Sequence, residues 1–309
     1  MGLIKLKPAC KDYIWGGDRL KKNYGKEFEG AVLAETWELS AHPDGPSVVV
    51  SGEYSGKTFP EYIEAKGKEI LGKDCGEFEN FPVLIKFIDA KQNLSVQVHP
   101  SDEYALKNEN QYGKTECWYI VDAEPGAGIY FGLKEGLTKE EFALKIRDNT
   151  LLDALNFVPV KKGEMYFIKS GTLHAIGAGT LIAEIQQNSN VTYRVYDFGR
   201  VGADGKPREL HIEKAIEVSD ISGIRPEYDF GTHLAQCRYF TVDSLDADGR
   251  AELNADDRSF VSVLVTEGEG KIRVEGEEMQ LLPGDSVFID AGSGRIEVEG
   301  NIKALVTRV

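Results

Sequence analysis

Short segments in which apolar and polar residues alternate occur along most of this chain and predict β-strands. Gly, Pro, Asn or Asp bounds each segment, and these residues favour the turns that end strands. The pattern therefore predicts an all-β fold. The predicted strands span residues 47–52, 81–88, 94–99, 116–122, 164–169, 181–186, 191–198, 238–245, 260–267, 271–276, 285–291 and 295–300.

Two segments interrupt the strand pattern with signals for helices. A capping box at Thr58 and Glu61 predicts one short helix that ends at Gly72. A second capping box begins at Thr138, and apolar residues at helical spacing follow it. This second segment predicts a helical insertion at about residues 133–157.

An internal repeat relates the two halves of the chain once that insertion is set aside. In both copies an apolar strand leads to a glycine turn, a second strand and a further glycine turn. The alignment pairs Gly163 with Gly284, Gly171 with Gly292, and His174 with Arg295. The repeat predicts one fold used twice, with the polar chemistry kept in the first copy.

The length of 309 residues also fits two cores. We predict a catalytic, metal-binding domain at residues 1–225 and a C-terminal domain without metal ligands at residues 226–309. The boundary is expected in the strand-poor stretch at residues 218–233.

Charge and composition exclude several classes of partner. A net charge of -15 repels a nucleic-acid backbone, although local cations could still bind a small anionic substrate. No segment approaches the roughly 20 apolar residues of a membrane span. The 4 cysteines are scattered without a CxxC pair, which is typical of free thiols in a reducing compartment. We therefore expect a cytoplasmic protein.

The candidate chemistry begins in the predicted strand at residues 94–99. Strand side chains alternate between two faces, so Ser95, Gln97 and His99 share one face while Val96 and Val98 pack on the other. Two potential metal ligands, Gln97 and His99, therefore lie one pleat apart. Without further ligands, a glutamine and a histidine at this spacing are more commonly hydrogen-bonded residues than metal ligands.

A second histidine changes that balance. The stretch from Gly163 through Gly171 to His174 resembles the second cupin motif, G-x5-P-x-G-x2-H-x3-N, with Lys169 at the proline and Ala178 at the asparagine position. Cupins are small jelly-roll barrels that hold a metal inside. The resemblance implies two cupin-type jelly-roll barrels with short helical insertions.

Two carboxylates compete for the remaining ligand position. Glu103 lies in a surface-like turn or helix, whereas Glu116 opens a strand and shares its inward face with Trp118. We therefore prefer Glu116. One amide oxygen, two imidazole nitrogens and one carboxylate fit zinc better than the two-histidine, one-carboxylate iron site of oxygenases. The predicted Zn2+ ligands are Gln97, His99, Glu116 and His174.

Segments spread over nearly the whole chain resemble type I mannose-6-phosphate isomerases (phosphomannose isomerases) of the short bacterial form. These are residues 7–20, 34–45, 81–105, 113–120, 170–177 and 182–200, the last reading IAEIQQNSNVTYRVYDFGR. The resemblance assigns the family's zinc ligands to the same four residues. It also implies an active-site arginine at Arg194 and a substrate-side lysine at Lys114.

The resemblance further implies sugar-phosphate contacts at Ser95, Lys86 and Arg200. Lys86 interrupts an apolar strand, where a buried ammonium needs an anion. Arginines can form paired hydrogen bonds to phosphate. The sequence departs from the longer relatives at residues 113–116, where Gly-Lys-Thr-Glu replaces Asn-His-Lys-Pro-Glu.

The implied reaction is reversible interconversion of mannose 6-phosphate and fructose 6-phosphate through an enediolate at zinc. The proton carrier stays open among Lys114, Glu184 and a zinc-bound hydroxide. The alternatives are a metal-dependent cupin of another class, either an oxygenase or a sugar epimerase, and a non-enzymatic sugar-binding cupin. We expect a small sugar phosphate as ligand and a monomer or homodimer.

Overall fold

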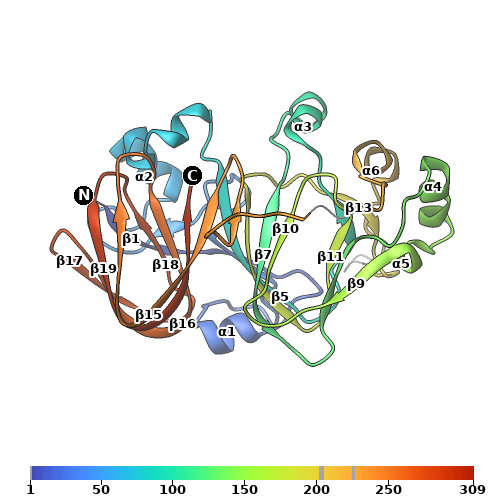
Figure 1. The fold of residues 1–309 in the computed structure, drawn as a ribbon. Helices are drawn as coiled ribbons and strands as arrows, with labels where there is room; N and C mark the ends of the chain where they lie inside the picture. Colours follow the sequence, from blue (N-terminus) through green and yellow to red (C-terminus); the bar gives the residue numbers. More distant parts are fainter. Residues whose placement is uncertain (1, 202–204, 225–226) are drawn as a thin grey trace. The chain divides into compact units, whose positions relative to one another are not determined.

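The computed structural model describes residues 2–201, 205–224 and 227–309. The described part of the chain is mostly β, as predicted, and divides into two compact units. Unit 1 comprises Met1–Asp12, Asp18–Phe87 and Phe230–Val309, and unit 2 comprises Tyr13–Gly17 and Ile88–Asp229. Figure 1 shows the elements of both units along the chain.

These units differ from the predicted domains. The predicted boundary at residues 225 and 226 lies outside the described residues, and the C-terminal segment of unit 1 begins close by, at Phe230. Most residues up to 87, however, group with that C-terminal segment. The reason is strand pairing: β1 (Leu3–Lys7) pairs antiparallel with β18 (Ser286–Ile289), so both ends of the chain build one sheet.

The main sheet of unit 1 has eight strands in the order β14-β15-β19-β16-β18-β1-β4, with β17 paired to β16. Its apolar face forms one buried cluster that includes Val263, Val287 and Val306. The remaining strands of this sheet are β4 (Val48–Val49), β14 (Ala235–Gln236), β15 (Thr241–Ala255), β16 (Val261–Val274), β17 (Glu277–Leu281) and β19 (Gly294–Arg308). Unit 1 also contains β2 (Ala9–Lys11), β3 (Glu35–Leu39), α1 (Arg19–Tyr24), α2 (Phe59–Lys66) and two 3₁₀ turns, Lys68–Leu71 and Asp74–Glu77.

Two sequence predictions in unit 1 are wrong in detail. The predicted strands at 260–267 and 271–276 form one strand, β16. A turn was expected between them, but Gly268 lies within the strand. Its φ is +78° and an added Cβ would lie 1.8 Å from the Asn301 carbonyl oxygen, so only glycine fits. The capping box at Thr58 is confirmed, but α2 ends before Gly67, whose φ of +92° breaks the helix.

Unit 2 places the predicted site strands in two sheets. A five-stranded sheet has the order β13-β6-β11-β8-β9, and β7 pairs antiparallel with both β10 and β12. The strands are β6 (Val96–Val98), β7 (Glu116–Ala123), β8 (Gly128–Leu133), β9 (Leu155–Pro159), β10 (Met165–Ile168), β11 (His174–Ile176), β12 (Thr180–Gln187) and β13 (Tyr193–Tyr196). β5 (Val83–Ala90) begins in unit 1 and ends in unit 2.

Helices cover one face of the five-stranded sheet. Val96 and Val98 of β6 are fully buried in a cluster with Phe142 of α4 (Lys139–Arg147) and Ala215 of α6 (Ile212–Val218). The opposite face is therefore left to the polar residues of the same strands. The other helices of unit 2 are α3 (Asp102–Asn108) and α5 (Leu151–Ala154).

The predicted insertion at 133–157 is helical only in part. The capping box at Thr138 is confirmed, and the helical residues are Lys139–Arg147 of α4 and Leu151–Ala154 of α5. Leu133 ends β8, while residues 155–157 belong to β9, because the apolar residues there pair with β8 instead of extending the helix.

The backbone confirms the predicted glycine repeat. Gly163 and Gly284 have φ values of +90° and +92°, and Gly171 and Gly292 have +90° and +80°. Each pair sits at equivalent turns around β10 and β18. The strand orders do not return to their first strand in the residues described, so hydrogen bonding does not confirm two closed jelly-roll barrels.

Candidate metal centre

The alternation predicted for residues 95–99 places ligands and core on opposite faces. Val96 and Val98 are buried under the helices, while Gln97 pairs in register with His174 of β11. Residues directly opposite each other in an antiparallel pair point to the same face. The two strands therefore bring Gln97 and His174 together, although 77 positions separate them in the chain.

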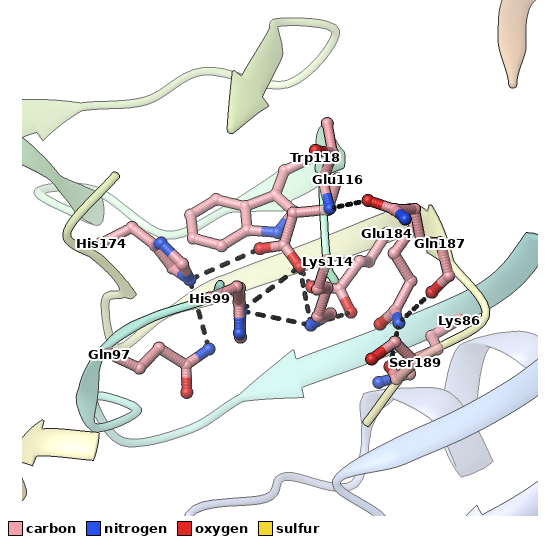
Figure 2. A network of polar contacts seen from close by, with 12 residues as sticks. Lys86, Gln97, His99, Lys114, Glu116, Trp118, His174, Glu184, Gln187 and Ser189 are labelled. Carbon is pink, nitrogen blue, oxygen red and sulfur yellow. Dashed lines mark hydrogen bonds and ion pairs between the residues drawn. The ribbon is translucent and has the colours of Figure 1, made fainter. Parts of the chain in front are cut away.

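Three buried side chains form a group that could hold a metal ion: His99, Glu116 and His174, whose candidate ligand atoms lie within 4.8 Å of one another. Nε2 of His99 is 3.6 Å from Oε2 of Glu116, and Nε2 of His174 is 3.5 Å from Oε1. Figure 2 shows both imidazoles beside this carboxylate. Glu103, the competing carboxylate, is exposed on α3.

Backbone carbonyls determine the orientation of both imidazoles. His99 Nδ1 lies 2.9 Å from the Val191 carbonyl oxygen, and His174 Nδ1 lies 2.8 Å from that of Thr172. Because a carbonyl oxygen can only accept, each Nδ1 carries a proton, and Nε2 of the neutral ring is then left with its lone pair. Burial also lowers the pKa of His174 to about 4, which keeps that ring neutral at pH 7.

Gln97 completes the predicted set from a half-buried position. Its Nε2 lies 3.3 Å from Nε2 of His174. A half-turn of the amide would put Oε1 in the same place, and this is the orientation that a metal ligand needs. Two neutral imidazole nitrogens, one carboxylate and one amide oxygen are a suitable donor set for a divalent ion.

Lys114 lies between two buried carboxylates. Its Nζ is 2.7 Å from Oε2 of Glu116 and 3.5 Å from Oε1 of Glu184. It is also 3.4 Å from Nε2 of His99. Trp118 donates from Nε1 to Oε2 of Glu184 at 2.9 Å, which fixes the second carboxylate (Figure 2). Lys114, predicted as a substrate-side lysine, therefore contacts two of the proposed metal ligands, Glu116 and His99.

Hydrogen bonds with Gln187 and Ser189 hold the segment that carries Lys114 and Glu116. Sequence reasoning did not predict these two supporting residues. The Thr115 amide donates to Oε1 of Gln187 at 2.7 Å, and Nε2 of Gln187 donates to Asp102 at 2.9 Å. Ser189 donates to the Tyr112 carbonyl at 2.8 Å. The signal available in the sequence was the polar run QQNSN directly after an apolar strand.

Arg194 lies on β13 opposite Gln97, which places both side chains on the same face of the sheet. Its Nε donates to Oγ of Ser95 at 3.2 Å. The structure thus joins Arg194 to Ser95, the residue predicted to contact the sugar phosphate. Its Nη1 also donates to the Glu209 carbonyl oxygen at 3.1 Å.

Arg200 belongs to a separate ion cluster centred on Asp197. Arg200 and Arg208 both donate to this buried carboxylate, and Arg208 does so from Nε at 2.7 Å. Burial opposes ionisation of Asp197, but the two arginines outweigh it and lower its pKa. Sequence reasoning missed Arg208, and its only signal was a cation in an otherwise turn-rich segment.

Lys86 belongs to unit 1, and its environment there is partly the one predicted. The ammonium is buried and does meet an anion, since its Nζ is 3.6 Å from Oε2 of Glu35. It also lies 4.8 Å from the ring centroid of Trp37. Contact with a sugar phosphate stays a prediction for this residue.

Two family models match this chain. The type I phosphomannose isomerase catalytic domain matches residues 3–123, and the mannose-6-phosphate isomerase cupin domain matches residues 231–309. A putative mannose-6-phosphate isomerase, YvyI of Bacillus subtilis (strain 168), is 37% identical over 99% of this chain and 98% of its own. The mannose-6-phosphate isomerase ManA of the same strain is 41% identical over 88% and 87%.

Solved structures give a consistent result. The crystal structure of the mannose 6-phosphate isomerase from Bacillus subtilis matches with a TM-score of 0.93 and 36% identity, and covers 100% of both chains. A putative mannosephosphate isomerase from Archaeoglobus fulgidus shares the fold with a TM-score of 0.80, covering 99% of this chain and 96% of its own. None of the helices in the described ranges is long and apolar enough to cross a membrane.

Proposed function

Because this chain belongs to the type I phosphomannose isomerase family, we propose that it interconverts mannose 6-phosphate and fructose 6-phosphate with the help of a bound zinc ion. The observation that carries this proposal is the buried group of His99, Glu116 and His174, with Lys114 in contact with it. A sugar phosphate in the cytoplasm is the expected substrate. The monomeric or homodimeric state and the two jelly-roll domains stay predictions.

The proposed metal ligands are Nε2 of both histidines, the Glu116 carboxylate and the Gln97 amide oxygen. The donor set supports zinc, because imidazole and carboxylate ligands suit this ion and the carbonyls on Nδ1 leave each Nε2 available. A bound zinc ion would act as a Lewis acid on the oxygen atoms of the sugar.

The reaction moves a proton between neighbouring carbons, so the protein must supply a group that accepts and returns it. The two site histidines are poor candidates, because Nδ1 of each donates to a carbonyl and Nε2 is assigned to the metal. Lys114 and Glu184 are the better candidates. They contact each other at 3.5 Å, and Trp118 holds the Glu184 carboxylate in place.

Arg194 is the proposed source of positive charge on the substrate side. It lies on the same face of the sheet as Gln97, and its Nε donates to Ser95, so strand pairing places it on the face that carries the proposed ligand Gln97. An arginine can form two parallel hydrogen bonds to an oxyanion or phosphate. Ser95, Lys86 and Arg200 are the further sugar-phosphate contacts that we propose from the family resemblance.

Elemental analysis combined with an isomerase assay tests this proposal. We expect Glu116→Ala to lose both bound zinc and activity, whereas Glu103→Ala, which removes an exposed carboxylate from α3, keeps both. Arg194→Ala should keep its zinc but lose activity by about a hundredfold, the effect of removing one charge-stabilising donor.

Full isomerase activity in protein stripped of metal would refute the zinc-dependent reaction. Bound zinc without exchange between the aldose and ketose would instead favour a metal-dependent cupin of another reaction class.

A further inference from the structure

We propose that His211 is a positioning residue for Arg194, holding the backbone of the arginine so that its side chain stays on the face of the sheet that carries Ser95 and Gln97. This inference rests on the active-site role proposed above for Arg194. His211 lies just before α6 and is 17 positions from Arg194 in the chain.

The contact completes the open side of an edge strand. Among the strands of the described residues, β13 is the first of its sheet and pairs with β6 alone. On its other side, the His211 amide donates to the Arg194 carbonyl at 2.8 Å, and the Arg194 amide donates to Nδ1 of His211 at 3.2 Å. The imidazole nitrogen thus occupies the place of a carbonyl oxygen in a neighbouring strand.

The same segment also holds the side chain of the arginine. Glu209 lies two residues before His211, and its carbonyl oxygen accepts a hydrogen bond from Nη1 of Arg194. Residues 209–211 therefore bind the amide, the carbonyl and the guanidinium of one residue. Displacement of residues 209–211 would release these three hydrogen bonds of Arg194 together. The hydrogen bond from Nε of Arg194 to Ser95 would remain.

The contact requires a neutral imidazole. A backbone amide can only donate, so Nδ1 of His211 must be an unprotonated acceptor. Burial lowers the pKa of His211, which favours this neutral form at pH 7. The titratable and charged groups around the ring are Tyr193 and Arg194 on β13, Glu109 after α3, and Glu209 and Lys214 on either side of it in the chain.

Three substitutions separate this role from simple packing. Asparagine places its Oδ1 close to the position of Nδ1, whereas glutamine reaches only the position of Nε2 and alanine supplies no acceptor. We expect His211→Asn to keep kcat within about threefold, and His211→Ala and His211→Gln to lower kcat about tenfold, the effect of one lost hydrogen bond. All three should bind zinc as the parent protein does, with KM nearly unchanged.

Amide hydrogen exchange reports on the contact independently of activity. We expect the Arg194 amide to exchange at least about tenfold faster in His211→Ala and His211→Gln than in the parent protein or His211→Asn. Tyr193→Phe is the local control. It removes the hydroxyl that donates to Glu109 but leaves the imidazole in place, so protection of the Arg194 amide should persist.

Acid pH supplies a second readout. Because burial lowers the pKa of His211, its ring is protonated only at pH values below the usual 6.5 of histidine. The ratio of kcat in the parent protein to kcat in His211→Asn should fall in that acid range, because protonation removes the acceptor only where the histidine is present. His233→Asn is the control, because it changes a histidine that is bonded to Asp243 in unit 1. The ratio of kcat in the parent protein to kcat in His233→Asn should stay constant over the same pH range. Loss of zinc at low pH would affect both proteins of each pair and cancels in the ratio.

Unchanged kcat and unchanged exchange of the Arg194 amide in both His211→Ala and His211→Gln would overturn the inference. So would an equal loss of kcat in His211→Asn. If Arg194→Ala itself kept full activity, the role proposed for Arg194 would fail, while the exchange rates would still show whether His211 holds its backbone.

Discussion

At the scale of single residues, three histidines of unit 2 use the same ring atom in opposite ways. Nδ1 of His99 and His174 faces a carbonyl oxygen and must donate, whereas Nδ1 of His211 faces an amide and must accept. The first two rings therefore direct a lone pair from Nε2 toward Glu116. The third uses its lone pair to hold a strand, which explains why a histidine can serve the site without being a ligand.

Burial of His174 leads to a prediction about stability in the metal-free protein. Its pKa is about 4 in the fold and near 6.5 in the unfolded chain, so the unfolded chain binds the proton first on acidification. This contribution to the free energy of unfolding is complete above pH 6.5 and is lost as pH falls toward 4. It amounts to about 3 kcal/mol.

Urea unfolding between pH 4 and 7, in the presence of a chelator, would measure this contribution. His174→Asn is the matched control, because its amide nitrogen can still donate to the Thr172 carbonyl but does not titrate. The control should show a smaller loss of stability across this range. An identical pH dependence in both proteins would contradict the prediction.

At the scale of elements, the local signals in the sequence were reliable where neighbouring residues decide the outcome. Both capping boxes form, and Val96 and Val98 point away from Gln97, because side chains alternate in any strand. One error was local, since the positive φ of Gly67 ends α2 early, and the error at β16 occurred where a distant partner decides. β16 continues through Gly268 because the Asn301 backbone lies against it, and no local pattern reports that approach.

Gly177 offers a test of such a close approach near the site. It directly follows β11, and an added Cβ would lie 2.0 Å from the Gly128 carbonyl oxygen at the start of β8. We expect Gly177→Ala to lower the free energy of unfolding by about 1–3 kcal/mol and to weaken zinc binding, because His174 lies on the strand that must shift.

Gly76→Ala is the control for that substitution. A Cβ added at Gly76 meets no atom within 4 Å, so the change should stay within about 0.5 kcal/mol. Chemical denaturation and zinc titration of the two variants would provide the comparison. Equal stability and equal zinc affinity for both variants would show that the backbone at Gly177 yields without cost.

At the scale of the whole molecule, unit 1 is built from both ends of the chain. β1 pairs with β18, Phe59 packs on Phe288 with ring centroids 4.9 Å apart, and Tyr62 donates to Asp290 at 2.7 Å. The repeat in the sequence indicated two similar cores. It could not indicate that the N-terminal segment joins the second core.

This arrangement predicts that residues 226–309 do not fold alone. The fragment would lack the strand that pairs with β18 and the aromatic residues that cover Phe288, and a buried apolar face would be exposed to water. We expect poor signal dispersion in an amide NMR spectrum of the fragment, in contrast to the full chain. A well-dispersed spectrum would instead support an independent C-terminal domain beginning near residue 226.

The sequence by itself determined the mostly β class, the two capped helix starts, the paired glycine turns and the histidines that gather around Glu116, because these follow from periodicity and from side-chain chemistry. Only the tertiary structure decided which imidazole nitrogen faces Glu116, which residues support Lys114, and how His211 meets Arg194. Those outcomes depend on hydrogen bonds between groups far apart in the chain, and a linear pattern carries no information about such distances.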